Sequence, residues 1–336
     1  MNAISSACPC LSPQEERLQE KIQGKENHFR KTHPRVFRLL ERFDGQKPRI
    51  DIERALYFTE SMRQTEGEHL TLRWAKALMH IAKNISVCVQ EDQLLLGRAG
   101  CDGRYGILYP ELDGDFLDIA VRDLPTRQQS PAYITEGDAR RVVEEIAPYW
   151  KGKTYHEDLN ASLPPEVHKL TYDDPDGLIS RFIVNETSSF RSSIQWVHDY
   201  EVVLKRGFNG LKQEMEEKLA ALDPASPVDQ VDKRPFIEAT ILVCDAIVLW
   251  AKRHADAARK AAEECADPVR KAELIRMAEN AEHVPGNPAR DFYEAVQSQY
   301  FTQMFSRLEQ KTGTTISNGR MDQYFYPFYK KDMEAG

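Results

Sequence analysis

Residues 236–251, with the sequence FIEATILVCDAIVLWA, form the most nearly continuous apolar run of the chain and decide how its second half folds. A membrane-spanning helix needs roughly 18–20 apolar residues. This run is shorter, and two acidic residues, Glu238 and Asp245, interrupt it. We therefore interpret the run as part of a helix buried in the protein core.

Helical patterns extend on both sides of this run. Apolar residues recur at helical spacing through most of the second half, and the breaks between helices fall at Asp267-Pro268 and at residues 284–288 (VPGNP). The spacing predicts helices over residues 199–222, 235–263, 267–282 and 288–310. The first of these contains two weak points, Gly207 and Gly210.

The first half of the chain is also mainly helical, but its segments are shorter. A short strand is predicted at residues 85–89. Beyond it, residues 94–97 lead into a Gly-rich irregular stretch that ends at residues 109–111. Residues 1–13 are expected to be disordered, and residues 151–177 to form loops and short helices. The predicted helices cover residues 13–43 with a break at His33-Pro34, 50–65, 72–85 and 138–146. Helix therefore dominates the whole chain.

Composition limits the classes of function. The chain has 336 residues, 41% hydrophobic and 29% charged, which is typical of a soluble globular protein. A formal net charge of −8 argues against nucleic acid and anionic membranes as partners. No signal peptide is recognisable, and six cysteines are too few for a disulfide framework in a chain this long. We expect a cytoplasmic protein with reduced thiols.

The last twenty residues carry an unusual concentration of aromatic side chains. Five large aromatics lie within residues 324–329, and the chain stops shortly after them. Each such side chain buries roughly 150–250 Å² when it is covered, and no later element is available to cover them. Two interpretations are open: a terminal helix that packs on its own core, or a chain that is cut inside a larger domain. We expect the second.

Most motifs that would identify a catalytic or metal site are absent. The sequence contains no HExxH, CxxC, GxSxG or phosphate-binding glycine loop. Cys101 lies in the loop Gly100-Cys101-Asp102-Gly103, but a cysteine in such a loop is usually only a small residue. The sequence therefore predicts no metal site, and we assign no catalytic role to this cysteine.

One short segment has the chemistry of an anion site. Arg191 and Gln195 are four residues apart, so on one helical turn their side chains share a face. The guanidinium fork and the amide N–H groups suit a tetrahedral oxyanion such as a sulfonate or phosphate. A turn of this kind is more often an exposed polar surface, so the residues alone leave both interpretations open.

A series of short motifs resembles one known family in the same order along the chain. Each motif is weak alone, but together they cover nearly everything from about residue 30 onward and are specific. The motifs are Glu53-Arg54-Ala55, Thr59-Glu60-Ser61, Thr65-Glu66-Gly67-Glu68, Arg73-Trp74-Ala75-Lys76-Ala77, Leu95-Leu96-Gly97, Tyr109-Pro110-Glu111, Asp199-Tyr200-Glu201, Val203-Leu204, Gly207, Trp250-Ala251, Arg253-His254-Ala255, Val284-Pro285, Phe292-Tyr293-Glu294-Ala295-Val296-Gln297 and Asn318-Gly319-Arg320-Met321-Asp322-Gln323-Tyr324. The chain resembles the N-terminal portion of the pyruvate formate-lyase-like glycyl radical enzymes.

The resemblance implies an α/β fold that is mostly helical in this portion and forms the N-terminal part of a ten-stranded α/β barrel. It implies a flexible or helical segment at residues 1–30 and the first part of the family's domain at residues 31–336. The family's thiyl cysteine lies in a Gly-Cys-x-Glu loop, and its radical glycine lies near the C-terminus of a chain more than twice as long. Neither occurs in this sequence, so we expect no catalytic residue and no activity in these 336 residues alone.

The resemblance also implies the cofactor and the partners. A separate radical S-adenosylmethionine activating enzyme installs the glycyl radical, and the lyase itself binds no metal or other cofactor. The family favours homodimers in the cytoplasm of anaerobic bacteria. The polar N-terminal 30 residues are compatible with enclosure in a microcompartment.

The substrate class follows from the turn that carries Arg191 and Gln195. Dehydratase-like members of the family tend to have a histidine at the position of Gln195, whereas sulfonate-cleaving members resemble this chain. The resemblance therefore implies cleavage of isethionate (2-hydroxyethanesulfonate) to acetaldehyde and sulfite, with both residues binding the sulfonate. Alternatives are a dihydroxypropane-sulfonate lyase, a diol or glycerol dehydratase-like enzyme, or a choline lyase-like enzyme. An alternative of another class is an inactive fragment, or an interaction partner of a separately made C-terminal half.

Overall fold

The computed structural model describes residues 30–98, 100–101, 104–112, 121–128, 131–172, 197–309 and 316–336, together with Gly24, His28, Gly114 and Leu117. The chain divides into two units, residues 1–46 and residues 47–336. The candidate site belongs to the second unit, which also contains most of the described helices.

The first unit contains helix α2, Pro34–Gly45. Proline is favoured at the first helical position. A backbone N–H there has no partner within the helix, so the proline loses no hydrogen bond by lacking one. Residues 30–32 are also helical, and the helix breaks at His33. The predicted break at His33-Pro34 is therefore confirmed, whereas the disorder predicted for residues 1–13 lies outside the described residues.

The second unit begins with two short parallel strands. Strand β1, Arg49–Asp51, pairs with β2, Tyr105–Ile107, in a register that places Ile50 opposite Gly106. The sequence pattern indicated a helix over 50–65 and an irregular stretch from residue 97 to residues 109–111, so both strands were missed. The Asp51 carboxylate accepts the Glu53 backbone N–H at 2.8 Å, which separates the strand from the helix after it.

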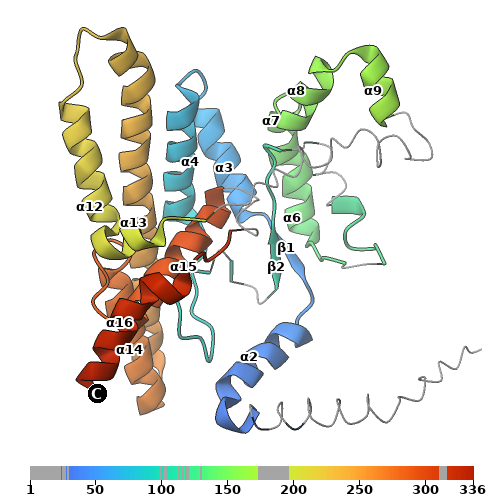
Figure 1. The fold of residues 1–336 in the computed structure, drawn as a ribbon. Coiled ribbons are helices and arrows are strands. Elements are labelled where there is room, and N and C mark those ends of the chain that lie inside the picture. Colours follow the sequence, from blue (N-terminus) through green and yellow to red (C-terminus); the bar gives the residue numbers. More distant parts are fainter. Residues whose placement is uncertain are drawn as a thin grey trace, which may run out of the picture. The chain divides into compact units, whose positions relative to one another are not determined.

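Helices make up most of the second unit (Figure 1). The predicted helices at residues 72–85, 199–222, 235–263 and 267–282 are confirmed within a few residues at each end. The helical elements are α3 Glu53–Gln64, α4 Leu70–Asn84, α6 Glu136–Arg141, the π-helical turn η1 Val142–Ile146, α7 Ala147–Trp150, α8 Tyr155–Ser162, α9 Pro165–Tyr172, α12 Tyr200–Ala220, the π-helical turn η2 Val228–Lys233, α13 Arg234–Glu264, α14 Pro268–His283, α15 Phe292–Glu309 and α16 Met321–Ala335.

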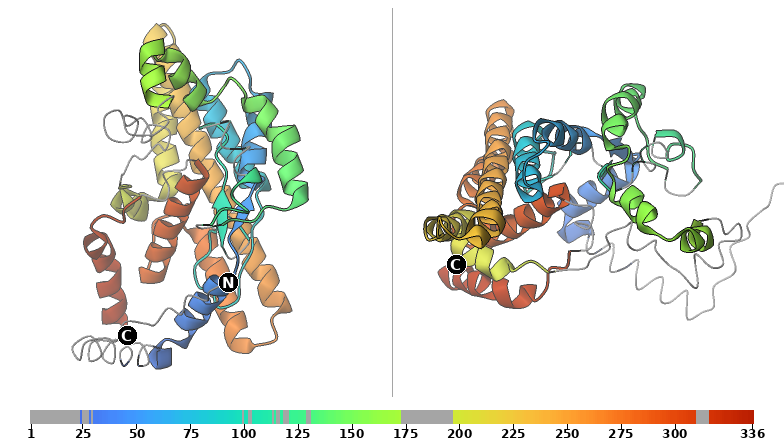
Figure 2. Two further views of the ribbon diagram at one scale, coloured as in Figure 1. Left: turned by 90° about the vertical axis from the view of Figure 1, so that its right-hand side faces the viewer. Right: turned by 90° about the horizontal axis from the view of Figure 1, so that it is seen from above.

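Helix α13 is the centre of the bundle, as the apolar run at residues 236–251 predicts. It packs against α4, α12 and α14, and α4 in turn packs against α3. Figures 1 and 2 show α13 between α12 and α4. The side chain of Trp250 is fully buried in this core and contacts Phe301 and Phe305, with ring centroids 5.8 and 5.6 Å apart.

The strand predicted at residues 85–89 is wrong, because this segment bonds to side chains and to a helix end instead of a strand. Ile85 donates its N–H to Ile81 O at 2.8 Å and so ends α4. The backbone N–H and the hydroxyl of Ser86 both bond to the Glu53 carboxylate at 2.6 Å. These bonds satisfy the polar groups that a neighbouring strand would otherwise have to pair.

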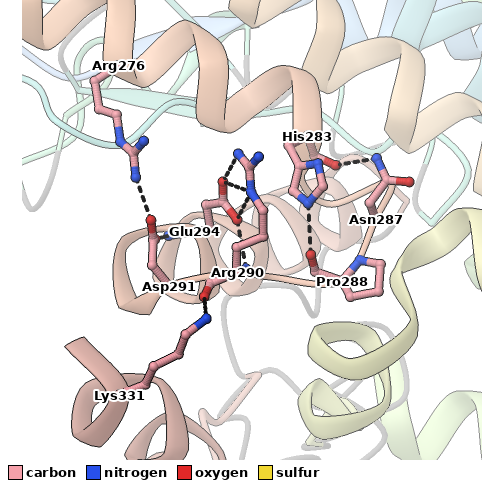
Figure 3. A network of polar contacts seen from close by, with 8 residues as sticks. All are labelled: Arg276, His283, Asn287, Pro288, Arg290, Asp291, Glu294 and Lys331. Carbon is pink, nitrogen blue, oxygen red and sulfur yellow. Dashed lines mark hydrogen bonds and ion pairs between the residues drawn. The ribbon is translucent and has the colours of Figure 1, made fainter. Parts of the chain in front are cut away.

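A polar network joins the end of α14 to the start of α15 and to α16 (Figure 3). The Arg290 guanidinium binds the Glu294 carboxylate, which is completely buried. Lys331 of α16 donates to Arg290 O at 2.8 Å, and Asp332 accepts the backbone N–H of Phe292 at 2.9 Å. These contacts hold the polar side of α16 against the N-terminus of α15.

The aromatic residues of α16 divide between a buried and an exposed side. Phe325 is 8% exposed and packs against Phe292 of α15, with ring centroids 5.7 Å apart. Tyr326 and Tyr329 are 58% and 48% exposed. The helix therefore docks on its own core through one side only.

Burial makes His254 of α13 a source of acid sensitivity. Its ring is completely buried and lies edge-on to Trp250, with centroids 4.8 Å apart. Burial, helped by the neighbouring Arg253 charge, lowers the pKa of His254 to about 3 from its ordinary value of 6.5. As pH falls from about 6.5 to about 3, the unfolded chain binds a proton here that the folded protein does not. The contribution of His254 to the free energy of unfolding is therefore greatest above pH 6.5, and it decreases progressively below that pH.

We expect this loss to follow a slope of up to about 1.4 kcal/mol per pH unit for one proton. The measurement is urea unfolding between pH 7.5 and 4 for the parent protein and for His254→Leu. The unfolding free energy of the parent protein minus that of His254→Leu should fall steadily as pH drops below about 6.5. A difference that does not change with pH would contradict the prediction.

Candidate functional site

The two residues predicted to bind the substrate, Arg191 and Gln195, lie outside the described residues. The structure does describe the residues immediately after them. We call Val197, His198, Asp199 and Tyr200 the anchor segment. It leads into α12 and contacts two elements that lie more than 100 residues further along the chain.

The first contact of the anchor segment is a backbone pairing. Val197 forms an isolated parallel β-bridge with Ser317. Two residues after Ser317, Gly319 adopts a φ of +63°, and a Cβ at this position would lie 2.6 Å from Val197 Cγ1. Only glycine accepts both the left-handed backbone and the close approach without strain, so residues 317–319 are shaped to receive Val197.

The second contact is made by a side chain. The His198 Nε2 atom lies 2.9 Å from Ser306 Oγ of α15. Ser306 also donates its hydroxyl hydrogen to Thr302 O at 2.9 Å. Because a hydroxyl has one hydrogen to give, His198 Nε2–H is the donor in the contact between the two side chains. Burial lowers the pKa of His198 from its ordinary value, which favours the neutral imidazole.

The third part of the anchor segment starts helix α12. The Asp199 carboxylate accepts the Val202 backbone N–H at 3.2 Å and caps the helix. Aspartate is among the preferred capping residues because it satisfies one of the free N–H groups of the first turn. The Tyr200 side chain is only 1% exposed and lies 5.6 Å from the ring of Tyr324, measured between centroids.

Amide side chains on α15 bind residues 316–318, the segment that pairs with Val197. Gln299 Nε2 donates to Asn318 Oδ1 at 2.8 Å, and Gln303 Nε2 donates to Ile316 O at 3.3 Å. Tyr324 OH donates to Asn318 O at 2.7 Å. Residues 316–319 are therefore fixed to α15 and α16, and they provide a rigid partner for Val197.

In the described parts of the chain we looked for a metal-binding site and for a reactive cysteine. No group of three or more His, Cys, Asp or Glu side chains could hold a metal ion there. A hydrogen bond with the Cys88 side chain, together with burial, raises the pKa of the Cys101 thiol. Since the thiolate is the nucleophilic form, Cys101 is poorly suited to nucleophilic attack.

Among the helices that the structure describes, none has the length and apolar character needed to cross a membrane.

Solved structures define the class of protein. The chain is similar to a glycyl radical enzyme from Archaeoglobus fulgidus, with 31% sequence identity, a TM-score of 0.79 and coverage of 90% of this chain and 37% of that one. A structure concerning 1,2-propanediol dehydration in Roseburia inulinivorans is also similar, with 31% identity, a TM-score of 0.83 and coverage of 90% and 35%. The mostly helical α/β fold is thus that of the glycyl radical enzymes, which confirms the predicted fold class.

The sequence narrows this class to a family. The pyruvate formate lyase-like family model matches residues 27–336, and the chain belongs to this family. It is also 86% identical over 326 residues to the isethionate sulfite-lyase of Bilophila wadsworthia, covering 97% of this chain. The chain spans 39% of that relative's length.

The contact between His198 and Ser306 was not predicted from the sequence. The motif Asp199-Tyr200-Glu201 marks the start of a helix and was identified. The pairing of His198 with Ser306 joins residues 108 positions apart, and no local pattern in the sequence indicates such a contact.

Proposed function

We propose that this chain is the N-terminal part of a glycyl radical carbon–sulfur lyase that cleaves isethionate to acetaldehyde and sulfite. The observation that carries the proposal is the 86% identity with the isethionate sulfite-lyase of Bilophila wadsworthia over nearly the whole chain. Such high identity argues that the parent enzyme acts on the same substrate.

In this proposal, Arg191 and Gln195 bind the sulfonate group. The planar Arg191 fork can bind two sulfonate oxygens, and the Gln195 amide adds further N–H donors. The same donors stabilise negative charge on the departing sulfite. Holding the sulfonate also fixes the position of the carbon that carries the hydroxyl, which is where reaction begins.

The chemical step requires groups that this sequence does not contain. The glycyl radical, installed by a radical S-adenosylmethionine activating enzyme, supplies hydrogen-atom abstraction through a cysteine thiyl. Overall, isethionate gives acetaldehyde and hydrogen sulfite, so the atoms balance without another reactant. This chain contributes binding and orientation, and we propose residues 31–336 as the first part of the catalytic domain in a cytoplasmic homodimer.

Replacing Arg191 by lysine in the full-length enzyme is expected to lower kcat/KM for isethionate at least tenfold. A lysine keeps the charge but loses the planar fork, so it cannot bind two sulfonate oxygens in the same geometry. A tenfold loss corresponds to about 1.4 kcal/mol of transition-state stabilisation. The measurement is anaerobic formation of acetaldehyde and sulfite after activation, with Arg140→Lys as a control on an exposed helix.

A kcat/KM that stays within about threefold of the parent value would exclude Arg191 as a sulfonate-binding residue. The same assay with 2,3-dihydroxypropane-1-sulfonate distinguishes the two sulfonate substrates. An absence of sulfite with either compound, at normal glycyl radical content, would overturn the proposed function. Activity that appears only when this chain is mixed with a separately made C-terminal half would support the alternative of a two-chain enzyme.

A further inference from the structure

Two cysteine side chains lie together outside the candidate site. Cys88 follows the end of α4, and Cys101 lies in the segment that leads into β2. The Cys101 thiol shares a hydrogen bond with the Cys88 side chain. Cys88 is half-buried and Cys101 is exposed, and both carry a thiol. The two sulfurs therefore meet close to the surface, where a small oxidant can reach them.

Other contacts hold the two segments against each other independently of the thiols. The Gln90 side-chain amide donates to Cys101 O at 3.0 Å, and Gln90 Oε1 accepts from the Arg98 guanidinium at 2.6 Å. Ser86, on the other side of Cys88 along the chain, lines the same cavity as Cys101. Because residues 86 and 90 both lie beside Cys101, the residue midway between them lies opposite it.

Each of the two segments is also fixed to the rest of the unit. Arg270 of α14 donates to Gln90 O at 3.2 Å and so holds the first segment. The second segment packs tightly on β1 and β2, since a Cβ at Gly100 would lie 3.0 Å from both the Asp51 carboxylate and the Tyr105 ring. Thiols that are held side by side react with each other faster than thiols that must first be brought together.

We propose that Cys88 and Cys101 form a site of reversible oxidation, at which a peroxide converts the two thiols to a disulfide. The inference does not depend on the proposed lyase activity. It assigns a modification site, and neither cysteine takes part in cleaving the sulfonate.

The reaction balances with hydrogen peroxide as the only co-reactant. The first thiol loses its proton, and its sulfur attacks a peroxide oxygen; the O–O bond breaks, which gives a sulfenic acid and one water. The second thiol attacks the sulfenic sulfur, the S–O bond breaks, and a second water leaves. Both sulfurs are oxidised and both peroxide oxygens are reduced. Since the thiolate is the reactive form and the pKa of Cys101 is raised, we assign the first step to Cys88 and the second to Cys101.

Peptide mapping of the full-length protein, before its activation, tests the pair directly. Trypsin cleaves after lysine and arginine, so Cys88 falls in the peptide of residues 84–98 and Cys101 in that of residues 99–104. The protein is treated with hydrogen peroxide, the remaining thiols are alkylated, and the digest is analysed by mass spectrometry. We expect the two peptides to appear as one disulfide-linked species. A thiol reductant added before alkylation should restore two separate, alkylated peptides.

The chain offers an internal control and matched variants. Cys265 is half-buried like Cys88, but its thiol donates to Asp267 O at 3.5 Å, so it should not be found in a linked peptide. Cys88→Ser and Cys101→Ser should each abolish the linked species. Oxidation should also raise the melting temperature of the parent protein, because closing the loop restricts the unfolded chain. Neither serine variant should show this rise.

Three results would overturn the inference. The first is a loss of alkylatable thiol at Cys88 and Cys101 without a linked species. The second is linkage of Cys101 to Cys265, or to other cysteines, as often as to Cys88, because oxidation would then be random. The third is a linked protein that melts at a lower temperature than the reduced one, since side chains already in place should form the bond without strain.

Discussion

Replacing Arg54 by methionine is expected to lower the free energy of unfolding by about 3–5 kcal/mol, the typical effect of removing one partner of a buried ion pair. The guanidinium of Arg54 is 1% exposed and binds the Glu111 carboxylate with two parallel hydrogen bonds of 2.8 and 2.7 Å. Methionine would leave the Glu111 carboxylate buried without its cation.

Further contacts make Arg54 hard to replace. It donates to the last carbonyls of α15, at Leu308 and Glu309, which have no partners within the helix. Its guanidinium also stacks between Phe58 and Tyr109, 4.5 and 4.4 Å from the ring centroids. The variant therefore loses a charge pair, a helix cap and two cation–π contacts together.

The measurement is urea unfolding of the parent protein and the variant, followed by circular dichroism. Arg259→Met is the matched control, because Arg259 also forms a two-bond pair, with Glu282, but at the exposed surface. The control should cost no more than about 1 kcal/mol. Similar losses for the two variants would show that burial does not decide the strength of the Arg54 pair.

Replacing Gly207 by alanine is expected to produce the second large effect, a loss of about 2–5 kcal/mol. Gly207 lies inside α12 with a φ of +65°, where a residue with a Cβ is strained by about 1–3 kcal/mol. The new Cβ would also lie 2.3 Å from Gly286 O and 2.6 Å from Asn287. Overpacking of this kind typically costs a further ~1–3 kcal/mol.

The close approach at Gly207 has a structural purpose. The kink frees two helical N–H groups, and Phe208 and Asn209 donate them to Pro285 O and Gly286 O at 2.9 and 2.8 Å. The loop between α14 and α15 is thereby joined to α12. A side chain at Gly207 would push the two segments apart and break these bonds.

Gly210→Ala is the control for this prediction. Gly210 lies three residues later in the same helix, and an added Cβ would meet nothing closer than Arg206 Cβ at 3.4 Å. Since alanine is the better helix former, this variant should be stabilised by about 0.5–1 kcal/mol. The measurement is the change in melting temperature of both variants relative to the parent protein. Equal changes would contradict the proposed clash at Gly207.

The helices were predictable from the sequence because they are encoded locally. The helix through residues 236–251 follows from a long run of apolar residues and ends just before Asp267-Pro268. The next helix ends just before residues 284–288, where proline and glycine stop a helix. The weak point at Gly207 was also recognised. Its exact conformation was not, because it depends on a loop nearly eighty residues away.

The strands were not predictable, because they depend on distant partners. Strand β1 has three residues, and its pairing with β2 depends on a segment more than fifty positions away. The segment at residues 85–89 has the composition of a strand, but Glu53 binds the backbone N–H of Ser86, and no described strand pairs with the segment. A short strand exists only where a neighbour completes its hydrogen bonds.

For the candidate site too, some features follow from the sequence and others only from the tertiary structure. The sequence by itself determined the helical framework and the family, because residue type and spacing carry this information. Arg191 and Gln195 as sulfonate-binding residues stay a prediction from the family resemblance. Only the tertiary structure decided that Arg54 caps α15 and that His198 meets Ser306. These contacts join residues 254 and 108 positions apart, and their energy comes from burial that no local stretch of sequence can specify.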